Sequence, residues 1–451
     1  MSKAYKLKNK IGSLLILGAG VFLRLVYVCF STIYDRQYDI GKIDIAAGAP
    51  VSGGHLGYIQ YIYHNLRLPD MDPTTVYQFH HPPIHHFISA LWMRFIGLFS
   101  TDTHFIEESI QIIPLICSII ILLTLKEIVE EFGLSSKAEN FVMAVFAFHP
   151  ALILLSGSVN NDCMALMFTF LVILYTIRWM KRKTAKNILC MALFLGLGIS
   201  TKQNVAELAF PIAVVFIFAL VNSIVSKKSN KASFSSLLGQ FLGFGFVSIP
   251  LGMWFYIRNL IKYNVSLVWV YELPKDSWQY VGDYPLINRY LWPIPSEMVD
   301  NLTHFKIGCG YNTWMQIIRT SVLGEWDMAT VGRPIKFLAV LLMLLGAILA
   351  FAAFISFFRN FLFTKKQDMN KVFFLLSYLV VMAFYLGFSY KYPQECSMNF
   401  RYIAVTLLFP AVALGMTYQK AKRTAYMTMN ILLSLFAICS IAMTAVWCLN
   451  L

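Results

Sequence analysis

The sequence predicts an all-α polytopic membrane protein with about 11 transmembrane helices. Of its 451 residues, 58% are hydrophobic and only 13% are charged, whereas soluble domains contain about 25% charged residues. Runs of about 20 mostly apolar residues occur at 11–30, 107–126, 139–157, 161–180, 187–201, 205–223, 237–257, 336–358, 371–390, 400–419 and 426–448. The composition excludes a soluble enzyme, a disordered chain and a nucleic-acid-binding protein, despite a net charge of +14.

The basic residues predict the orientation of these helices, because Lys and Arg collect on the cytoplasmic side. Lysines at positions 3, 6, 8 and 10 precede the first run, so we expect a cytoplasmic N-terminus. A twelfth stretch, 84–100, is short and contains two histidines and an arginine. If it is an amphipathic interfacial helix, the basic clusters at 181–186, 227–231, 365–371 and 420–423 all become cytoplasmic. We therefore expect this helix to lie in the first outer loop.

The predicted topology divides the chain into three parts. Residues 1–258 form an N-terminal transmembrane module with an outer loop at 31–106, residues 259–335 form a second large outer loop, and residues 336–451 form the C-terminal transmembrane helices. A transporter or channel would place ionisable residues in mid-span. Here the polar residues cluster mostly at the outer ends of the helices, so we expect the chemistry there.

Carboxylates and histidines mark the first outer loop. Asp39 follows the first span, with Asp35 and Asp44 nearby. A partly buried carboxylate at a membrane surface suits a general base, although ordinary solvated loop charges explain the same pattern. Four histidines flank Pro82 and Pro83, namely His80, His81, His85 and His86. A metal site is one explanation, but the prolines separate the pairs, so helix capping, acid–base work or phosphate contacts fit better and no metal ligand is predicted.

Polar turns and cations recur at other outer helix ends. Residues 160–162 (NND) form a turn that suits the cap of the following helix. Lys202 stands alone in the turn STKQN, and Arg24, Arg258 and Arg401 are expected near the same leaflet. Snorkelling explains each cation singly. Four outer-facing cations on four different segments indicate a common anion such as a lipid phosphate.

The order of these features resembles the polyprenyl-phosphate-sugar-dependent glycosyltransferases of the C-type superfamily, especially the bacterial protein O-mannosyltransferase and aminoarabinose transferase group. The resemblance covers about residues 10–260. It is carried by Arg24, 34–41 (YDRQYDIG), 54–58 (GHLGY), 81–84 (HPPI), 160–162 (NND), 201–202 (TK) and 254–259 (WFYIRN), with a weaker match at 398–403 (MNFRYI).

The resemblance implies a role for each matching residue. Asp39 corresponds to the catalytic base and Asp162 to the second acidic site residue, while Lys202 and the outer arginines correspond to groups that hold the lipid-phosphate leaving group. Many members have an Asp-Glu pair in the first loop, where this chain has Gly54 and His55 before Tyr58. We expect His55, Tyr58 and His81 to orient the acceptor or the sugar.

The expected function is an inverting hexosyl or pentosyl transfer on the outer face of the cell membrane. A polyprenyl-phosphate-linked sugar is the donor, and a hydroxyl of a protein, lipid or glycan is the acceptor. A divalent cation at Asp39 is compatible with this chemistry but not required. The alternative is a flippase or transporter of a polyprenyl-linked substrate that does no chemistry; it needs a path through the bundle instead of a closed outer site.

Overall fold

The computed structural model describes residues 3–34, 39–41, 53–225, 231–305, 310–363 and 368–449, without side-chain detail at 3–10 and 231–233. Asp35, Asp44, the N-terminal lysines and parts of the basic clusters at 227–231 and 365–371 are therefore outside the description. The described residues form helices and connecting segments, with one isolated β-bridge between Tyr280 and Gln394.

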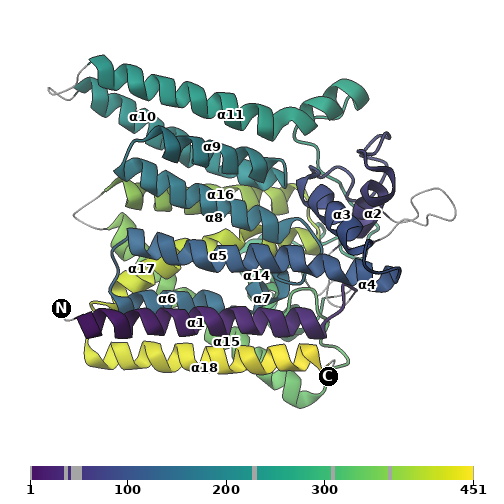
Figure 1. Ribbon diagram of the computed structural model, residues 1–451. Coiled ribbons are helices and arrows are strands. Elements are labelled where there is room, and N and C mark those ends of the chain that lie inside the picture. Colours follow the sequence, from purple (N-terminus) through teal and green to yellow (C-terminus); the bar gives the residue numbers. More distant parts are fainter. Residues whose placement is uncertain are drawn as a thin grey trace.

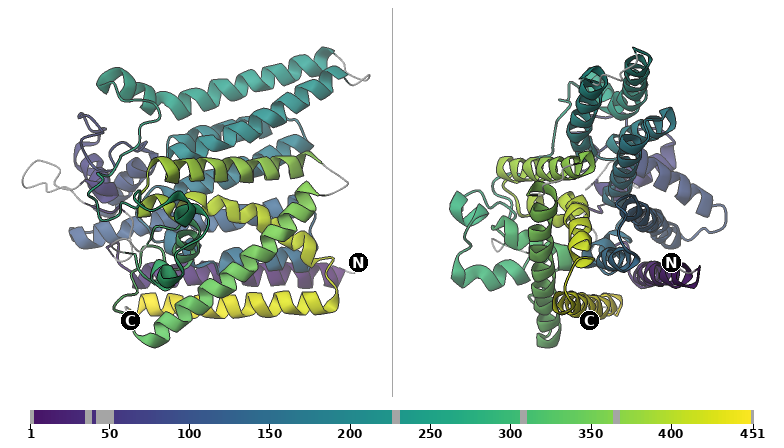
Figure 2. Two further views of the ribbon diagram at one scale, coloured as in Figure 1. Left: turned by 180° about the vertical axis from the view of Figure 1, so that it is seen from behind. Right: turned by 90° about the vertical axis from the view of Figure 1, so that its left-hand side faces the viewer.

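Nine of the described helical segments are long and apolar enough to cross a membrane. The predicted fold class is thus confirmed. These segments contain α1 (Lys3–Phe30), α5 (Ile112–Glu131), α8 (Asp162–Lys181), α10 (Ala209–Val225), α11 (Lys231–Tyr263), α15 (Arg333–Phe357), α16 (Met369–Lys391), α17 (Leu408–Tyr418) and α18 (Arg423–Cys448). In Figures 1 and 2, α10 and α11 lie at one edge of the bundle, and α1 and α18 lie at the other.

The two remaining predicted spans are shorter than expected. The segment 139–157 is broken into α6 (Ser136–Ala147) and α7 (Pro150–Leu155), because Pro150 has no backbone N–H to continue the helical hydrogen bonds. The segment 187–201 becomes α9 (Ala185–Ile199), whose 15 residues span about 22 Å at 1.5 Å per residue. This length falls short of the roughly 30 Å of a bilayer core.

Even so, α9 runs back along α8. Residues 182–184 join the two helices at one end. At the other end, Lys202 follows α9 and forms an ion pair with Asp162, the first residue of α8. The pair α6–α7 likewise connects α5 to the start of α8. Together with the nine long segments, α6–α7 and α9 make eleven passes of the described chain along the bundle. Figure 1 shows the two termini at opposite ends of the bundle.

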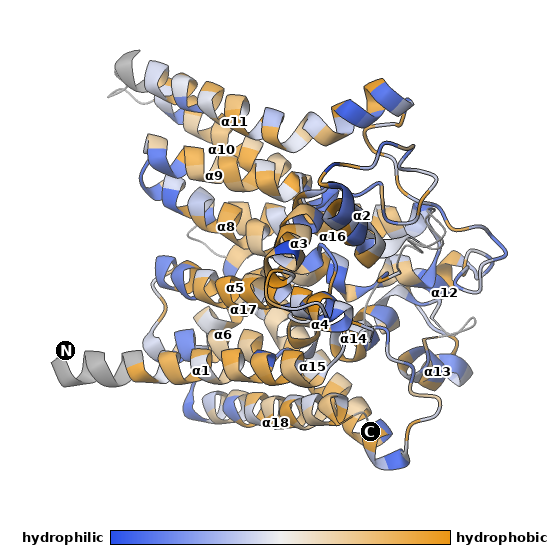
Figure 3. Ribbon diagram, turned by 45° about the vertical axis from the view of Figure 1, so that its right-hand side comes forward, coloured by the Kyte–Doolittle hydropathy of each residue, from blue (hydrophilic) through white to orange (hydrophobic). Residues whose placement is uncertain are grey.

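The two large loops gather at the end of the bundle away from the N-terminus (Figures 1 and 3). The first contains α2 (Gly54–Asn65), α3 (Ile84–Ile96) and α4 (Thr103–Glu108). The second contains α12 (Leu286–Tyr290), α13 (Met298–Thr303) and α14 (Thr313–Leu323). The predicted interfacial helix corresponds to α3, whose 13 residues are too few to cross a bilayer.

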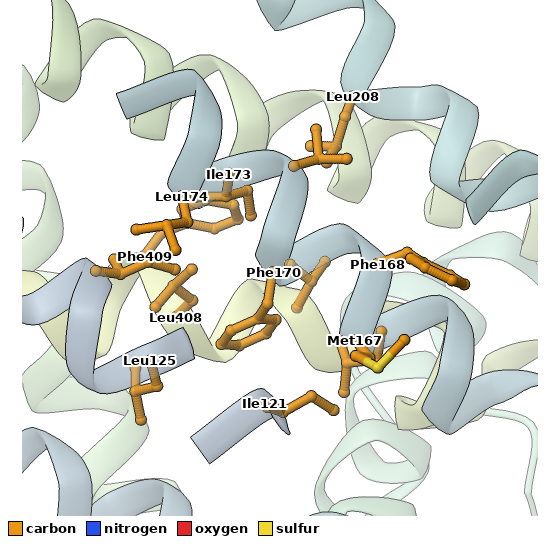
Figure 4. Close-up of a cluster of buried hydrophobic side chains, with 14 of the residues drawn as sticks. Ile121, Leu125, Met167, Phe168, Phe170, Ile173, Leu174, Leu208, Leu408 and Phe409 are labelled. Carbon is orange, nitrogen blue, oxygen red and sulfur yellow. The ribbon is translucent and has the colours of Figure 1, made fainter. Parts of the chain in front are cut away.

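The interior of the bundle is centred on α8, where Met167, Phe170 and Ile173 pack against Ile121 of α5 and Phe409 of α17 (Figure 4). Because lipid tails are as apolar as these side chains, close packing between helices replaces the hydrophobic effect as the stabilising term. Small residues permit the closest contact: a Cβ atom on Gly196 of α9 would lie 2.7 Å from Leu251 Cβ on α11.

We predict that Gly196→Ala destabilises the protein by about 1–3 kcal/mol, because the added methyl group overpacks the α9–α11 contact. The control is Gly239→Ala on α11, where an added Cβ atom meets nothing within 4 Å and should stabilise the helix slightly. The thermal unfolding midpoint in detergent measures both. A Gly196 variant as stable as the Gly239 variant would contradict the packing described here.

Candidate active site

The backbone around Asp39 fixes the position of this residue within the first outer loop. Its φ of 55° is uncommon for a residue with a side chain. The carbonyl groups of Asp39 and Ile40 accept hydrogen bonds from the N–H groups of His55 and Leu56, both at 2.9 Å, and so satisfy the first turn of α2. A Cβ atom on Gly54, which has a φ of 87°, would lie 2.3 Å from the carbonyl oxygen of Ile40. Glycine is therefore required at position 54.

The Asp39 carboxylate meets partners from two other parts of the chain. One oxygen accepts a short hydrogen bond from the hydroxyl of Tyr77. The other lies 2.8 Å from Arg401 Nη2. The Asp39 side chain is 20% exposed, so the carboxylate is held in position but stays accessible.

Asp162 begins α8 and is buried, with 5% exposure. Its N–H group donates to Asn160 Oδ1 at 3.0 Å, and Asn161 Nδ2 donates to the carbonyl oxygen of Thr201 at 2.9 Å. The NND turn thus joins the start of α8 to the TK turn after α9. One Asp162 oxygen pairs with Lys202, and the other lies 3.3 Å from Arg401 Nη1.

Arg401 therefore joins the two carboxylates. Arg401 and Lys202 are each only 8% exposed. Both cations also lie over the ring of Tyr402, with Lys202 Nζ at 4.9 Å and Arg401 Cζ at 5.1 Å from the ring centroid. We call Asp39, Asp162, Lys202 and Arg401 the ion-pair cluster. It brings together four residues that the sequence predicts for one site.

Five histidines lie beside this cluster: His55, His85 and His86 are buried, and His80 and His81 are half-buried. His55 Nδ1 is 2.9 Å from His86 Nε2, and the ring of His81 stacks on that of His55 with centroids 5.4 Å apart. Burial lowers the pKa of His80 and of His85 to about 4, and the pKa values of His55, His81 and His86 fall well below the usual range for the same reason. All five are thus neutral at physiological pH.

The donor set does not fit a metal ion. In the described part of the chain, no group of three or more His, Cys, Asp or Glu side chains is arranged to hold one. The carboxylate oxygens of Asp39 and Asp162 face Arg401, Lys202 and Tyr77. A cation at Asp39 would have to displace the guanidinium group, so we derive no chemical step through a metal.

Part of the chain matches a known protein family. Residues 80–254 match the family model described as dolichyl-phosphate-mannose-protein mannosyltransferase. The predicted resemblance is confirmed. No curated protein sequence matches the chain at a significant level.

Solved structures share the fold. The Archaeoglobus fulgidus oligosaccharyltransferase in complex with Zn and sulfate has a TM-score of 0.52 at 13% identity, and covers 94% of this chain and 53% of its own. The same organism's AglB, with an inhibitory peptide and a dolichol-phosphate, has a TM-score of 0.52 at 13% identity and covers 98% and 56%. This chain therefore spans about half their length. ArnT from Cupriavidus metallidurans bound to undecaprenyl phosphate is less similar, with a TM-score of 0.39, 10% identity, and 94% and 79% covered.

Three site neighbours were not predicted from the sequence: Tyr77, Tyr402 and Glu325. Tyr77 is separated from Asp39 by 38 positions, and Glu325 lies in the second outer loop, 4.0 Å from Arg401 Nη2. Nothing in a single sequence pairs these residues with Asp39 or Arg401. The second loop also covers the first, since Trp269 packs edge-on against His80 and Tyr271 packs edge-on against Tyr77.

Two further predicted site residues, Arg258 and Tyr58, contact other parts of the first outer loop. Arg258 donates to the carbonyl oxygen of Pro69 at 2.8 Å and to Asn259 Oδ1 at 2.9 Å, so it anchors the first outer loop to α11. Tyr58 is 1% exposed and stacks on Phe79 and His86 at 4.7 and 4.3 Å. Tyr58 therefore helps to fix the ring of His86 by stacking on it.

Arg24 lies elsewhere, in the middle of α1, and is 1% exposed. Its guanidinium group donates to the carbonyl oxygens of Phe146 and Ala147 at 3.1 and 2.9 Å. In an unbroken helix, Phe146 would bond to the N–H of residue 150, which is a proline here. Arg24 replaces that missing donor where α6 ends, and it also donates to Ser118 Oγ at 2.7 Å. The structure thus gives Arg24 a role in folding, away from the ion-pair cluster.

We predict that Arg24→Met lowers the thermal stability by about 2–5 kcal/mol, because two buried carbonyl groups lose their donors. The exposed Arg423 provides the control, since Arg423→Met removes the same charge from the surface. Unfolding midpoints in detergent compare the two variants. Equal midpoints for the Arg24 variant and the parent protein would show that the break after α6 does not depend on this side chain.

Proposed function

We propose that this protein is an inverting glycosyltransferase that moves a sugar from a polyprenyl-phosphate donor to an acceptor hydroxyl on the outer face of the cell membrane. The observation that carries the proposal is the ion-pair cluster, which joins a partly exposed carboxylate to two buried cations. The mannosyltransferase family match and the fold shared with a dolichol-phosphate-bound oligosaccharyltransferase support a lipid-linked donor.

The two cations suit the phosphate of the donor. Lys202 Nζ and the Arg401 guanidinium group both pair with Asp162, so they are held near one another before any substrate binds. Hydrogen bonds from charged donors to phosphate oxygens are strong. Donors that are fixed in advance stabilise charge that develops in the transition state. Here that charge appears on the phosphate as the bond to the sugar breaks.

Asp39 is placed to act as the general base. In the proposed step, the acceptor oxygen attacks the anomeric carbon while its proton passes to the Asp39 carboxylate. The bond from the anomeric carbon to the phosphate oxygen breaks, and its electron pair stays on the polyprenyl phosphate. A single displacement of this kind inverts the configuration at the anomeric carbon. His55 and His81, both neutral, orient the acceptor or the sugar by hydrogen bonds.

Arg401 couples the two halves of this step. It lies 2.8 Å from Asp39 and 3.3 Å from Asp162. A phosphate that binds Arg401 is therefore held next to the Asp39 carboxylate, which brings the leaving group and the general base to the same place.

The sidedness follows from the termini. Asp39 of the cluster belongs to the first of the two large loops, and these loops gather at the end of the bundle away from the N-terminus (Figure 1). The N-terminal lysines are predicted to be cytoplasmic. We therefore propose that the site faces the outside. The cluster and its neighbour Glu325 come from all three predicted parts of the chain, with Asp162 and Lys202 in 1–258, Glu325 in 259–335 and Arg401 in 336–451.

The packing beneath the cluster favours an enzyme over a flippase. From Asp162 to Phe170, every residue of α8 is buried. A transporter needs a polar path through the bundle, whereas this stretch continues into the apolar core of Figure 4.

We predict that Asp39→Asn lowers transfer by about 10²–10⁴-fold, because general-base catalysis contributes that much. The full chain in liposomes is supplied with a panel of polyprenyl-phosphate sugars that includes dolichyl phosphate mannose, together with extracted membrane acceptors. Asp70→Asn is the control, since Asp70 lies in the same loop and pairs with the exposed Lys262.

Binding of dolichyl phosphate should remain intact in the Asp39 variant, because Lys202 and Arg401 are unchanged. An Asp39 variant with parental turnover would remove this carboxylate from the chemistry. Movement of intact lipid-linked sugar across the liposome membrane, without transfer, would instead support the flippase.

A further inference from the structure

Glu325 brings a third carboxylate to Arg401 from the second outer loop. It lies between α14 and α15, directly after Gly324, which has a φ of 59° and ends α14. Glu325 Oε1 is 4.0 Å from Arg401 Nη2, the same nitrogen that contacts Asp39 at 2.8 Å. The Glu325 side chain is 18% exposed, so it remains in reach of solvent.

A second contact fixes the carboxyl group. Asn399 Nδ2 donates to Glu325 Oε1 at 3.4 Å, while Asn399 Oδ1 accepts from the N–H of Arg401 at 3.1 Å. Asn399 therefore holds Glu325 and the Arg401 backbone together. Any change in the charge of Glu325 acts directly on the guanidinium group that lies between Asp39 and Asp162.

The charges around Arg401 do not balance when every group is ionised. This part of the chain brings together four carboxylates and three cations: Asp39, Asp162, Glu325 and Glu395 against Lys202, Arg401 and Arg319. A phosphate would add further negative charge to this enclosed site, which is unfavourable at low dielectric. A proton on one carboxyl group removes the excess.

The surroundings identify Glu325 as the group that takes this proton. Burial raises the pKa of Glu325 to about 8, while Arg401 opposes the rise. The charged and titratable groups that face Glu325 come from five other segments and are Arg401, Asp39, Arg319, Asp162 and Cys396. Of the three carboxylates that contact Arg401, Glu325 also lies farthest from it, at 4.0 Å against 2.8 Å for Asp39 and 3.3 Å for Asp162.

We propose that Glu325 is a positioning residue that controls Arg401 through its own proton, so that the site accepts a lipid phosphate when Glu325 is neutral and loses affinity when Glu325 ionises. When Glu325 is neutral, the Arg401 guanidinium group interacts with Asp39, Asp162 and the incoming phosphate. Ionised Glu325 repels the phosphate and draws the guanidinium group toward the second loop. This inference rests on the proposed function for the identity of the anion.

The sign of the pH effect follows directly. As the pH rises through the pKa of Glu325, the carboxyl group loses its proton, and we expect the affinity for dolichyl phosphate to fall by about tenfold or more, which corresponds to a single repulsive charge nearby. Glu325→Gln stays neutral at every pH. It should bind like the parent protein at mildly acidic pH and more tightly than the parent protein at alkaline pH.

The test is the binding of dolichyl phosphate to the detergent-solubilised full chain, measured by thermophoresis from mildly acidic to alkaline pH. The parent protein is compared with Glu325→Gln, with Glu325→Asp, which still titrates, and with Glu272→Gln, which changes an exposed glutamate of the same loop. Titration of the lipid phosphate itself affects all four proteins equally, so only the difference between them reports Glu325.

Loss of the alkaline decrease in Glu325→Gln, with the decrease retained in Glu325→Asp and Glu272→Gln, is the expected result. An unchanged pH profile in Glu325→Gln would overturn the inference, and so would a variant that binds weakly at every pH while remaining folded. Because binding is measured without transfer, a protein that binds dolichyl phosphate in this pH-dependent way but transfers no sugar would refute the proposed function and leave the role of Glu325 standing.

Discussion

The sharing of one guanidinium group among several carboxylates is the interaction on which the site depends. Arg401 lies against Asp39 from the first outer loop, Asp162 at the start of α8, and Glu325 from the second outer loop. Removing one partner of a buried ion pair leaves an uncompensated charge. The contacts with Arg401 therefore hold both outer loops against the bundle. The same contacts place a carboxylate next to two cations, and the proposed transfer from a lipid phosphate depends on this arrangement.

The rest of the bundle supports this arrangement. The short helix α9 ends so that Lys202 reaches Asp162, and close contact at Gly196 holds α9 against α11. The break before Pro150 ends α6 early, and Arg24 satisfies the carbonyl groups that the break leaves free. The regular helix α8 begins at Asp162 and continues into the apolar core of the bundle.

Much of the fold was predictable, because apolar runs and basic clusters report the membrane directly. Asp39, Asp162, Lys202 and Arg401 could also be predicted, since a polar residue at an outer helix end stands out against an apolar chain. Arg24 has the same appearance in the sequence, yet it serves a broken helix, because a buried cation can be satisfied by carbonyl groups as well as by an anion. Glu325 and Tyr77 were missed because ordinary loop positions acquire meaning only through contacts between distant segments.

The most direct test is an experimental structure of the full chain in a lipid nanodisc with dolichyl phosphate bound. The account predicts that the phosphate lies within about 3 Å of both Lys202 Nζ and the Arg401 guanidinium group, with the Asp39 carboxylate on the same side of the membrane and facing the phosphate. A phosphate bound away from these two cations, or an Asp39 carboxylate separated from Arg401 by the width of the bundle, would contradict it.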